Sequence, residues 1–310
     1  MGHQDLRMMA LDSPLIILLT PDPVLLEAIT VNDFGIPQRN QIYPGAITQL
    51  SSKEISTSDP TLMIELFNQV PGVFMQSGAL NTNKITLRGV GSRAAFATKK
   101  IRAYYQDIPL TNGSGETTIE DIDLNTIGTI EILKGPNASI YGSGLGGTLI
   151  LHPKKTPSAS QSFSTAATVG SFGLLRNSLT YALDRNQRST HISFNRQQSD
   201  GYRENNTFKR NTLFATSRIG TLKNTFNFLI YYVNQYAGIP SSLSETDYQN
   251  EPTKAAFTWA QSQGFEDYDK FLLGSSWAHT YHPGLTQHVS LFGSFNQSFE
   301  ARPFNILEDQ

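Results

Sequence analysis

The chain has 310 residues, of which 38% are hydrophobic, and its formal net charge is −2. This hydrophobic share is low for a water-soluble protein of this length, whereas alternating membrane strands need only half of their side chains to be apolar. Lysine and arginine are scattered, so no surface for nucleic acid is expected. Cysteine is absent, which excludes disulfides, thiol catalysis and zinc-thiolate sites, and the dispersed histidines predict no metal or cofactor site.

The N-terminal stretch is a poor secretion signal. Its longest apolar run, PLIILL at 14–19, is too short to span a membrane, and Asp5 and Asp12 interrupt the segment. No small-residue cleavage site follows. Two explanations stay open, a mis-assigned start and an unusual signal.

Residues 47–151 mix short apolar runs with helical spacing, which is typical of a small α+β domain. A helix is expected at TLMIELFNQV, because Asp59 can cap it, Pro60 suits the first helical position, and Leu62, Leu66 and Phe67 share one face. Glycine, asparagine and proline separate the predicted strands, which lie at 84–90, 103–110, 127–135 and 147–153.

The sequence GSGLGG at 142–147 fits the G-x-G-x-x-G pattern of dinucleotide-binding enzymes. These glycines lead into a predicted strand, and no helix follows that could direct its N-terminus at a pyrophosphate. No GK[ST] follows them either, which excludes a phosphate-binding P-loop. A tight approach of two backbone segments is therefore the preferred interpretation, and the chain is not expected to be an enzyme.

After the polar linker at 154–160, the rhythm changes to long alternating segments. About seven strands are predicted, most of them longer than the roughly five or six residues usual in soluble proteins and long enough for the roughly 9–11 that a tilted membrane crossing needs. They lie near 162–172, 173–184, 188–198, 207–219, 224–236, 267–281 and 285–299.

Alternation in these strands predicts one apolar and one polar face. In the last strand, Val289, Leu291, Gly293, Phe295 and Phe299 fall on one face, and His288, Ser290, Ser294, Asn296 and Ser298 on the other. A barrel wall between lipid and a polar lumen needs this pattern, although a soluble sandwich would also alternate.

Connections between the strands separate these two possibilities. Short links, RNQ, GTLK and HPG, alternate with longer polar ones, apart from a tight first hairpin near residues 171–173. Short turns on one side and long loops on the other are typical of bacterial membrane barrels. Tyrosines near strand ends are consistent with interfacial girdles.

The motifs DPTLMIELFNQVPGVFMQ, KITLRGVGSR and IGTIEILKGPNASIYGSGLGGTLIL occur in the order and spacing of the plug of TonB-dependent outer-membrane receptors. This resemblance covers residues 40–155, and the following strands look like the start of that family's barrel. The stretch AGIPSSLSETDYQNEPTKAAFTWAQSQGF is similar to an external loop of receptors for siderophores and ferric citrate.

The resemblance implies an α+β plug domain followed by antiparallel transmembrane β-barrel strands, in a Gram-negative outer membrane. Expected divisions are an N-terminal extension at 1–39, the plug at 40–155 and the barrel part at 156–310. Large plugged barrels have about 22 strands, so an incomplete barrel and a fragment of a longer protein are expected, because an open sheet would leave unpaired backbone groups in lipid.

In function, the resemblance implies energised uptake of a ferric siderophore or ferric citrate-like chelate, with TonB of the inner-membrane complex as partner, outer-membrane lipid as surroundings and no nucleic acid. Corrinoids and glycans are variants of the ligand. The alternative is a β-rich envelope binding or adhesion module without transport, which a helix in place of the plug sheet would favour.

The resemblance also implies residue roles. Arg88 in LRG and Lys134 in ILKGP match plug positions that face the barrel wall and pair with its acidic residues, which are expected on strands beyond this sequence. Glu131 could instead partner Arg88 within the plug. A charge in a packed lumen needs such a partner, because burying it alone is costly.

Coupling to TonB should use a short extended segment before the plug that can add as a strand to a partner sheet. EAITVND at 27–33 is the candidate, with Glu27, Ile29, Thr30 and Val31 as its key residues.

Ligand contacts should come from plug loops at 76–83, 91–100 and 111–117. Arg93, Lys99 and Lys100 could attract an anionic iron chelate, because a negative ligand gains from a basic pocket. The full set of candidates is Gln76, Asn81, Arg93, Lys99, Lys100 and Asn112.

Overall fold

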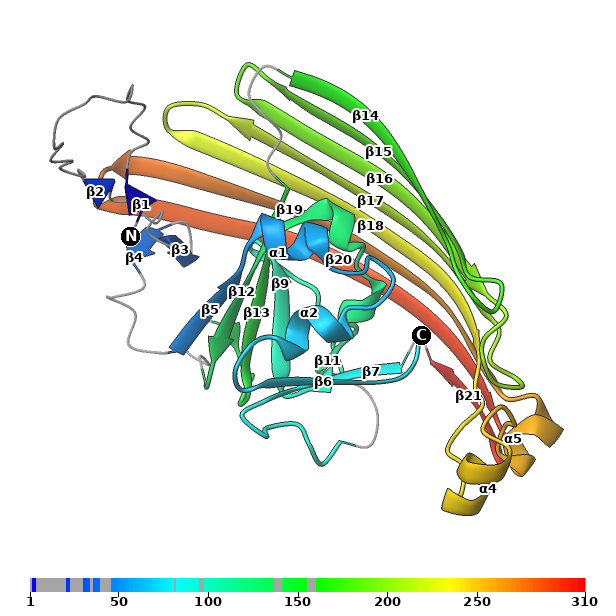
Figure 1. Ribbon diagram of the computed structural model, residues 1–310. Helices are drawn as coiled ribbons and strands as arrows, with labels where there is room; N and C mark the ends of the chain where they lie inside the picture. The colour runs from blue at the N-terminus through cyan, green and yellow to red at the C-terminus, as the bar shows by residue number, and fades with distance from the viewer. Residues whose placement is uncertain are drawn as a thin grey trace, which may run out of the picture. The chain divides into compact units, whose positions relative to one another are not determined.

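The computed structural model describes residues 2–3, 21–22, 30–33, 36–39, 46–80, 82–94, 98–136, 141–154 and 160–309 (Figure 1). Two compact units divide the chain, Met1–Pro44 and Gly45–Gln310. Two strand pairs are described in the first unit: β1 (Gly2–His3) with β2 (Pro21–Asp22), and β3 (Thr30–Asp33) with β4 (Ile36–Arg39).

The second unit begins with the predicted plug, built around a sheet of five described strands in the order β10-β9-β13-β12-β5. Only β9 and β13 run parallel. The bounds are β5 Ala46–Leu50, β9 Ile101–Tyr105, β10 Ile108–Pro109, β12 Ile127–Lys134 and β13 Gly147–Pro153. The predictions at 127–135 and 147–153 are confirmed, whereas 103–110 is two strands, because a turn at Gln106 and Asp107 folds β10 back on β9.

Smaller elements surround this sheet. Strands β6 and β7 form a hairpin. The strand predicted at 84–90 is β7, which begins at Thr82 and ends at Leu87. The bounds are β6 Val73–Ala79, β7 Thr82–Leu87, β8 Thr98–Lys99, β11 Glu116–Thr117, and the 3-10 turns η1 Ile119–Asp121 and η2 Leu124–Thr126.

Two short helices precede the hairpin, α1 (Ser52–Thr57) and α2 (Ile64–Asn68). The helix predicted from Asp59 is shorter than expected, because the Asp59 carboxylate accepts from the Thr61 main-chain N–H at 2.7 Å and so closes a turn before the helix. Helix α1 was not predicted. Its signal is the S-x-x-E capping box of Ser51 and Glu54, whose carboxylate accepts from Ser51 N at 2.7 Å.

The glycine run at 142–147 has the structural role that the sequence favoured. Gly147 begins β13 with φ +141°, and a Cβ there would lie 2.2 Å from the Leu133 carbonyl oxygen on the neighbouring strand β12. Gly144 is also close-packed, since a Cβ there would lie 2.9 Å from the Gly147 carbonyl oxygen. A nucleotide phosphate has no room between these strands.

The rest of the described unit, residues 160–309, is one antiparallel sheet of eight strands in sequence order, here called the wall. The seven predicted strands are present, and a short eighth follows. The bounds are β14 Ser160–Val169, β15 Leu175–Arg185, β16 Arg188–Ser199, β17 Phe208–Gly220, β18 Asn224–Gly238, β19 Phe265–His282, β20 Leu285–Arg302 and β21 Asn305–Asp309.

The wall curves around the plug (Figure 1), and its two faces differ as predicted. On the outer face, Leu291 is 76% and Phe295 55% exposed. On the plug side, Ser193, Asn195 and Gln197 are buried. Apolar side chains on the outside and polar ones on the inside suit a surface that meets lipid. Among the described residues, no helix is long and apolar enough to cross a membrane.

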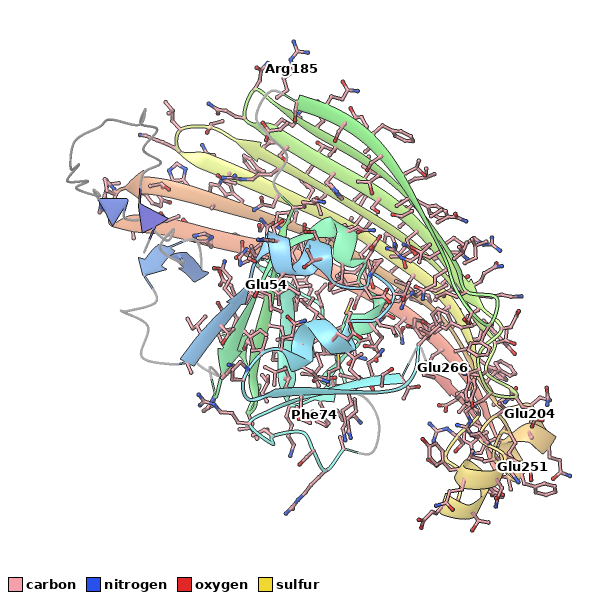
Figure 2. The ribbon with its side chains drawn as sticks, in the orientation of Figure 1. Glu54, Phe74, Arg185, Glu204, Glu251 and Glu266 are labelled. Carbon is pink, nitrogen blue, oxygen red and sulfur yellow. The ribbon has the colours of Figure 1, made fainter. Side chains whose placement is uncertain are left out.

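The ends of the wall also differ. Tight turns follow β15, β17 and β19, and long connections follow β16 and β18 at the other end; Figure 2 shows Arg185 at the first end and Glu204 and Glu251 at the second. We call these the short-turn end and the long-loop end. Two connections at the long-loop end are nevertheless short: the β14–β15 hairpin and the β20–β21 turn.

The long β18–β19 connection contains helices α4 (Glu245–Asn250) and α5 (Phe257–Ser262). The Arg203 guanidinium anchors it by donating to the carbonyl oxygens of Ser241 at 2.5 Å, Lys254 at 3.0 Å and Pro240 at 3.3 Å. Charged hydrogen bonds of this kind are stronger than neutral ones. The loop therefore has a defined shape.

Plug and wall share one hydrophobic core. Tyr105 of β9 meets Phe214 of β17 edge to face, with ring centroids 5.0 Å apart, and both are buried. Ile108 of β10 packs over Gly274 of β19, where a Cβ would lie 2.6 Å from the Ile108 Cδ1 atom. The Ile108 side chain of the plug thus packs directly against the wall backbone at Gly274.

We expect Gly274→Val to destabilise the docked plug by about 1–3 kcal/mol, because the new side chain would overlap Ile108. Limited proteolysis of the plug and thermal unfolding in detergent would measure this. Gly293→Val is the control, since a Cβ there meets nothing within 4 Å. Equal behaviour of both variants would contradict the packing described.

Candidate functional site

The plug meets the polar face of the wall through the segment IEDID, residues 119–123. Turn η1 holds Glu120 and Asp121, and Asp123 caps η2 by accepting from Asn125 N at 3.0 Å. All three carboxylates are buried. Burying several like charges needs compensation by cations, and the wall supplies them from β15, β17 and β19.

The first compensating contact joins Asp123 to Arg176 of β15, with 2.6 Å between Oδ1 and Nη2. Both side chains are only 3% exposed. The second carboxylate oxygen, Oδ2, accepts from Asn195 Nδ2 at 3.3 Å. This pair ties the plug to β15 and β16.

The second contact joins Asp121 to Lys270 of β19, with 2.6 Å between Oδ2 and Nζ. The Tyr268 hydroxyl donates to the other carboxylate oxygen, and Lys270 also donates to the Thr118 hydroxyl. Burial opposes ionisation of Asp121, but Lys270 and then Arg210 outweigh it, so the pKa of this carboxyl lies below its usual value. Asp121 is therefore ionised and paired.

Glu120 differs from its neighbour. Burial and then the Asp121 carboxylate raise the pKa of Glu120 to about 8. Arg210 of β17 donates through Nη1 to the Glu120 main-chain oxygen at 2.6 Å, and the carboxyl atom Oε2 has no hydrogen-bond partner among the described atoms. Glu120 is thus neutral at pH 7 while Asp121 is ionised, which limits the negative charge in the interface.

The residues predicted to pair with the wall lie elsewhere in the plug. Lys134 donates to Thr48 Oγ1 at 2.8 Å and to the Pro71 carbonyl oxygen at 2.6 Å. Partial burial and the nearby Arg88 lower its pKa. Arg88 itself is exposed. Their pairing with acidic wall residues stays a prediction.

The alternative partner for Glu131 was wrong. Its buried carboxylate lies 3.3 Å from His152 Nε2 on the adjacent strand β13, and not within ion-pair distance of Arg88. The physical reason is register, because β12 and β13 pair Thr129 with His152 and so place this imidazole beside Glu131.

Sequence reasoning missed the carboxylates that hold the plug. A signal was present, because E-D-x-D is a dense acidic run three residues before the apolar strand β12. The cations were also visible, since Arg176 falls on the polar face of its strand and Arg210 and Lys270 alternate in the same way. The resemblance implies basic residues on the plug and acidic residues on the wall. In the described contacts the plug supplies the carboxylates and the wall the cations.

The ligand candidates are distributed over the plug. Gln76 lies exposed on β6 opposite Lys84, and Asn112 accepts from Glu116 N at 2.9 Å. Asn81 lies outside the described residues. Arg93, Lys99 and Lys100 are exposed.

Two coupling candidates, Thr30 and Val31, lie on β3 opposite Arg39 and Gln38 of β4. Glu27 and Ile29 lie outside the described part of the chain. The segment's role stays a prediction.

A family model supports the plug directly. Residues 39–148 match the TonB-dependent receptor plug domain. Over this segment the chain is similar to the plug domain of the TonB-dependent receptors. The plug precedes antiparallel strands with an apolar outer face, an arrangement that suits an outer-membrane protein.

Named relatives agree with this assignment. The chain is 27% identical over 132 residues to the iron-regulated outer membrane virulence protein of Vibrio cholerae, which covers 42% of this chain and 20% of that protein. It is 27% identical over 115 residues to the pesticin receptor of Yersinia pestis, with 36% and 16% covered. These receptors are not enzymes.

Solved structures show the same fold. The ferric citrate transporter FecA, unliganded, aligns with a TM-score of 0.69 and 17% identity over 83% of this chain and 40% of its own. The ferric yersiniabactin uptake receptor FyuA from Yersinia pestis aligns with a TM-score of 0.70 and 17% identity, over 85% and 43%. The chain spans less than half the length of each of these four proteins.

We expect Arg176→Met to destabilise the docked plug by about 3–5 kcal/mol, because Asp123 would remain buried without its cation. Unfolding in detergent, followed by the intrinsic fluorescence of the protein, would measure this. Arg218→Met is the control, since Arg218 of β17 also lies on the plug-facing side of the wall but is exposed. Its effect on the free energy of unfolding should stay within about 0.5 kcal/mol. Similar losses in both variants would argue against the pair.

Glu120 predicts a pH dependence. Its folded-state pKa of about 8 lies above the ordinary value of 4.5, so the folded chain binds this proton more tightly than the unfolded chain. Stability should therefore fall as pH rises from 4.5 to about 8. Glu120→Gln cannot ionise and should flatten this fall, as midpoints of thermal unfolding across the range would show. An unchanged slope would refute the neutral state.

Proposed function

We propose that this chain serves energised uptake of a ferric chelate through a plugged outer-membrane barrel. The observation that carries the proposal is the interface in which Asp121 and Asp123 of the plug meet Lys270 and Arg176 of the wall. Relatives named as a ferric citrate transporter, a ferric yersiniabactin uptake receptor and an iron-regulated protein support iron as the cargo.

This interface suits a gate that opens only under external work. Separating one partner of a buried ion pair costs about 3–5 kcal/mol, and this plug has two such pairs and a shared apolar core. Thermal motion therefore opens it rarely. TonB, pulling on the extension at 1–39, would supply the work, with 27–33 added as a strand to a partner sheet.

The ligand would enter at the long-loop end, which faces outward in barrels with short periplasmic turns. Plug residues Gln76, Asn81, Arg93, Lys99, Lys100 and Asn112 are proposed to contact it. In this assignment residues 40–155 act as the plug and 156–310 as part of the barrel. The adhesion alternative lacks a specific supporting observation, since the plug sheet is present.

A disulfide between plug and wall would test this proposal. The chain has no cysteine, and Ile108 and Gly274 are in direct contact, close enough for a bond whose Cβ atoms must lie about 3.5–4.5 Å apart. In a receptor carrying Ile108→Cys and Gly274→Cys, oxidation should abolish TonB-dependent uptake of ⁵⁵Fe-chelate, and reduction should restore it.

The Ile108→Cys single variant is the control and should take up iron under both conditions. Binding of the chelate to the oxidised double variant should persist, because the lock affects plug movement and not the outer surface. Full uptake through the locked receptor would contradict a gate at this interface. Uptake that does not need TonB would contradict energised transport.

A further inference from the structure

A cleft of about 360 Å³ lies at the long-loop end between plug and wall. The plug contributes Leu62 and the tip of the β6–β7 hairpin, residues 77–80. The wall contributes the β14–β15 hairpin and the β16–β17 connection. Small-molecule sites typically occupy about 300–1,000 Å³, so this cleft can hold a substantial part of a ligand.

The chemistry of the cleft is uncharged. Among the described residues, its lining contains apolar, hydroxyl and amide side chains and no lysine, arginine, histidine, aspartate or glutamate. Beside the lining, Asp200 packs its carboxylate against Gly173. The guanidinium of Arg203, which follows Tyr202, is already bound to the carbonyl oxygens of the β18–β19 connection. An anionic group placed here would lose water without gaining a cation, which is unfavourable.

Two aromatic rings stand in the cleft wall. Phe172 and Tyr202 meet edge to face with centroids 5.3 Å apart and an interplanar angle of 74°. They are 53% and 47% exposed. Rings of this kind gain from burial against a further aromatic ring, in addition to the area covered.

The backbone holds Phe172 in an unfavourable conformation. Its φ is +58°, a region that bulky residues rarely adopt. Its carbonyl oxygen accepts from Asp200 N at 2.8 Å and from Ser199 Oγ at 3.1 Å, which locks the two wall loops together. Strain of this kind persists where the surroundings enforce it, and it is concentrated at functional positions.

We infer that the Phe172–Tyr202 pair and the β6–β7 hairpin receive an uncharged aromatic ring of the transported chelate. This inference rests on the proposed function and narrows its ligand to chelates with neutral aromatic groups, in preference to citrate. Because the hairpin belongs to the plug, an occupied cleft bridges plug and wall.

A neutral iron chelate with aromatic rings, tris(maltolato)iron(III), is the probe. Equilibrium dialysis with ⁵⁵Fe should show saturable binding to the receptor in detergent. Phe172→Gly should weaken this binding about tenfold, while Tyr202→Phe, which keeps the ring, should retain it. Phe304→Gly is the matched control, since Phe304 is an exposed phenylalanine at the same end of the wall and outside the cleft lining.

Phe172→Gly also separates a binding role from a structural one. Glycine adopts positive φ freely, so relief of strain should leave the unfolding temperature unchanged or raise it by about 2–4 °C while binding falls. Loss of binding together with a lower unfolding temperature would overturn the assignment, and so would unchanged binding.

Two further results would also count against the cleft. Ferric citrate competing equally with the probe would contradict an uncharged site. If the Phe172→Gly receptor were no longer retained in lipid vesicles but still bound the probe, the Phe172 ring would be a membrane anchor instead. Neither result affects TonB-dependent uptake, which tests the proposed function separately.

Discussion

The pairing of buried plug carboxylates with wall cations is the constraint on which this structure depends. Arg176, Arg210 and Lys270 face inward from three separate strands, and without the plug each would line an unneutralised polar surface. Asp121 and Asp123 meet two of them, and the Glu120 main chain meets the third. Plug and wall are therefore electrostatically complementary.

A reversed distribution of polarity accompanies this pairing. Ordinary globular proteins place apolar side chains inside, but this wall exposes Phe295 and Leu291 and buries Asn195 and Gln197. Lipid on one side and a plug on the other make the arrangement favourable. The aromatic contact of Tyr105 and Phe214, with the packing of Ile108 over Gly274, adds non-polar adhesion to the ion pairs between plug and wall.

The sequence predicted the wall strands well, because a period of two over ten or more residues is a strong signal that tertiary context rarely overrides. Strands β12 and β13 were also clear, bounded by glycine and proline. The 59–70 helix was overextended, because Asp59 closes a turn of its own. The capping box at Ser51 was readable but lay in a short segment with one buried residue, Ile55.

The site was less predictable, since interfacial pairing depends on which strands face which plug turn. Sequence distances of 53 residues between Asp123 and Arg176, and 149 between Asp121 and Lys270, carry no local pattern. Arg88 and Lys134 fitted a family position but make their described contacts elsewhere. The cleft was not predictable from the sequence, because its lining comes from separate segments of plug and wall that only folding brings together.

The anchoring of the β18–β19 connection by Arg203 affects how this side of the receptor meets the outside medium. The Arg203 guanidinium binds three carbonyl oxygens, so the β18–β19 connection is ordered before anything binds to it. Little conformational entropy then remains to be lost on binding. Arg203 comes from the β16–β17 connection. Any displacement of the β18–β19 connection would therefore move the β16–β17 connection with it.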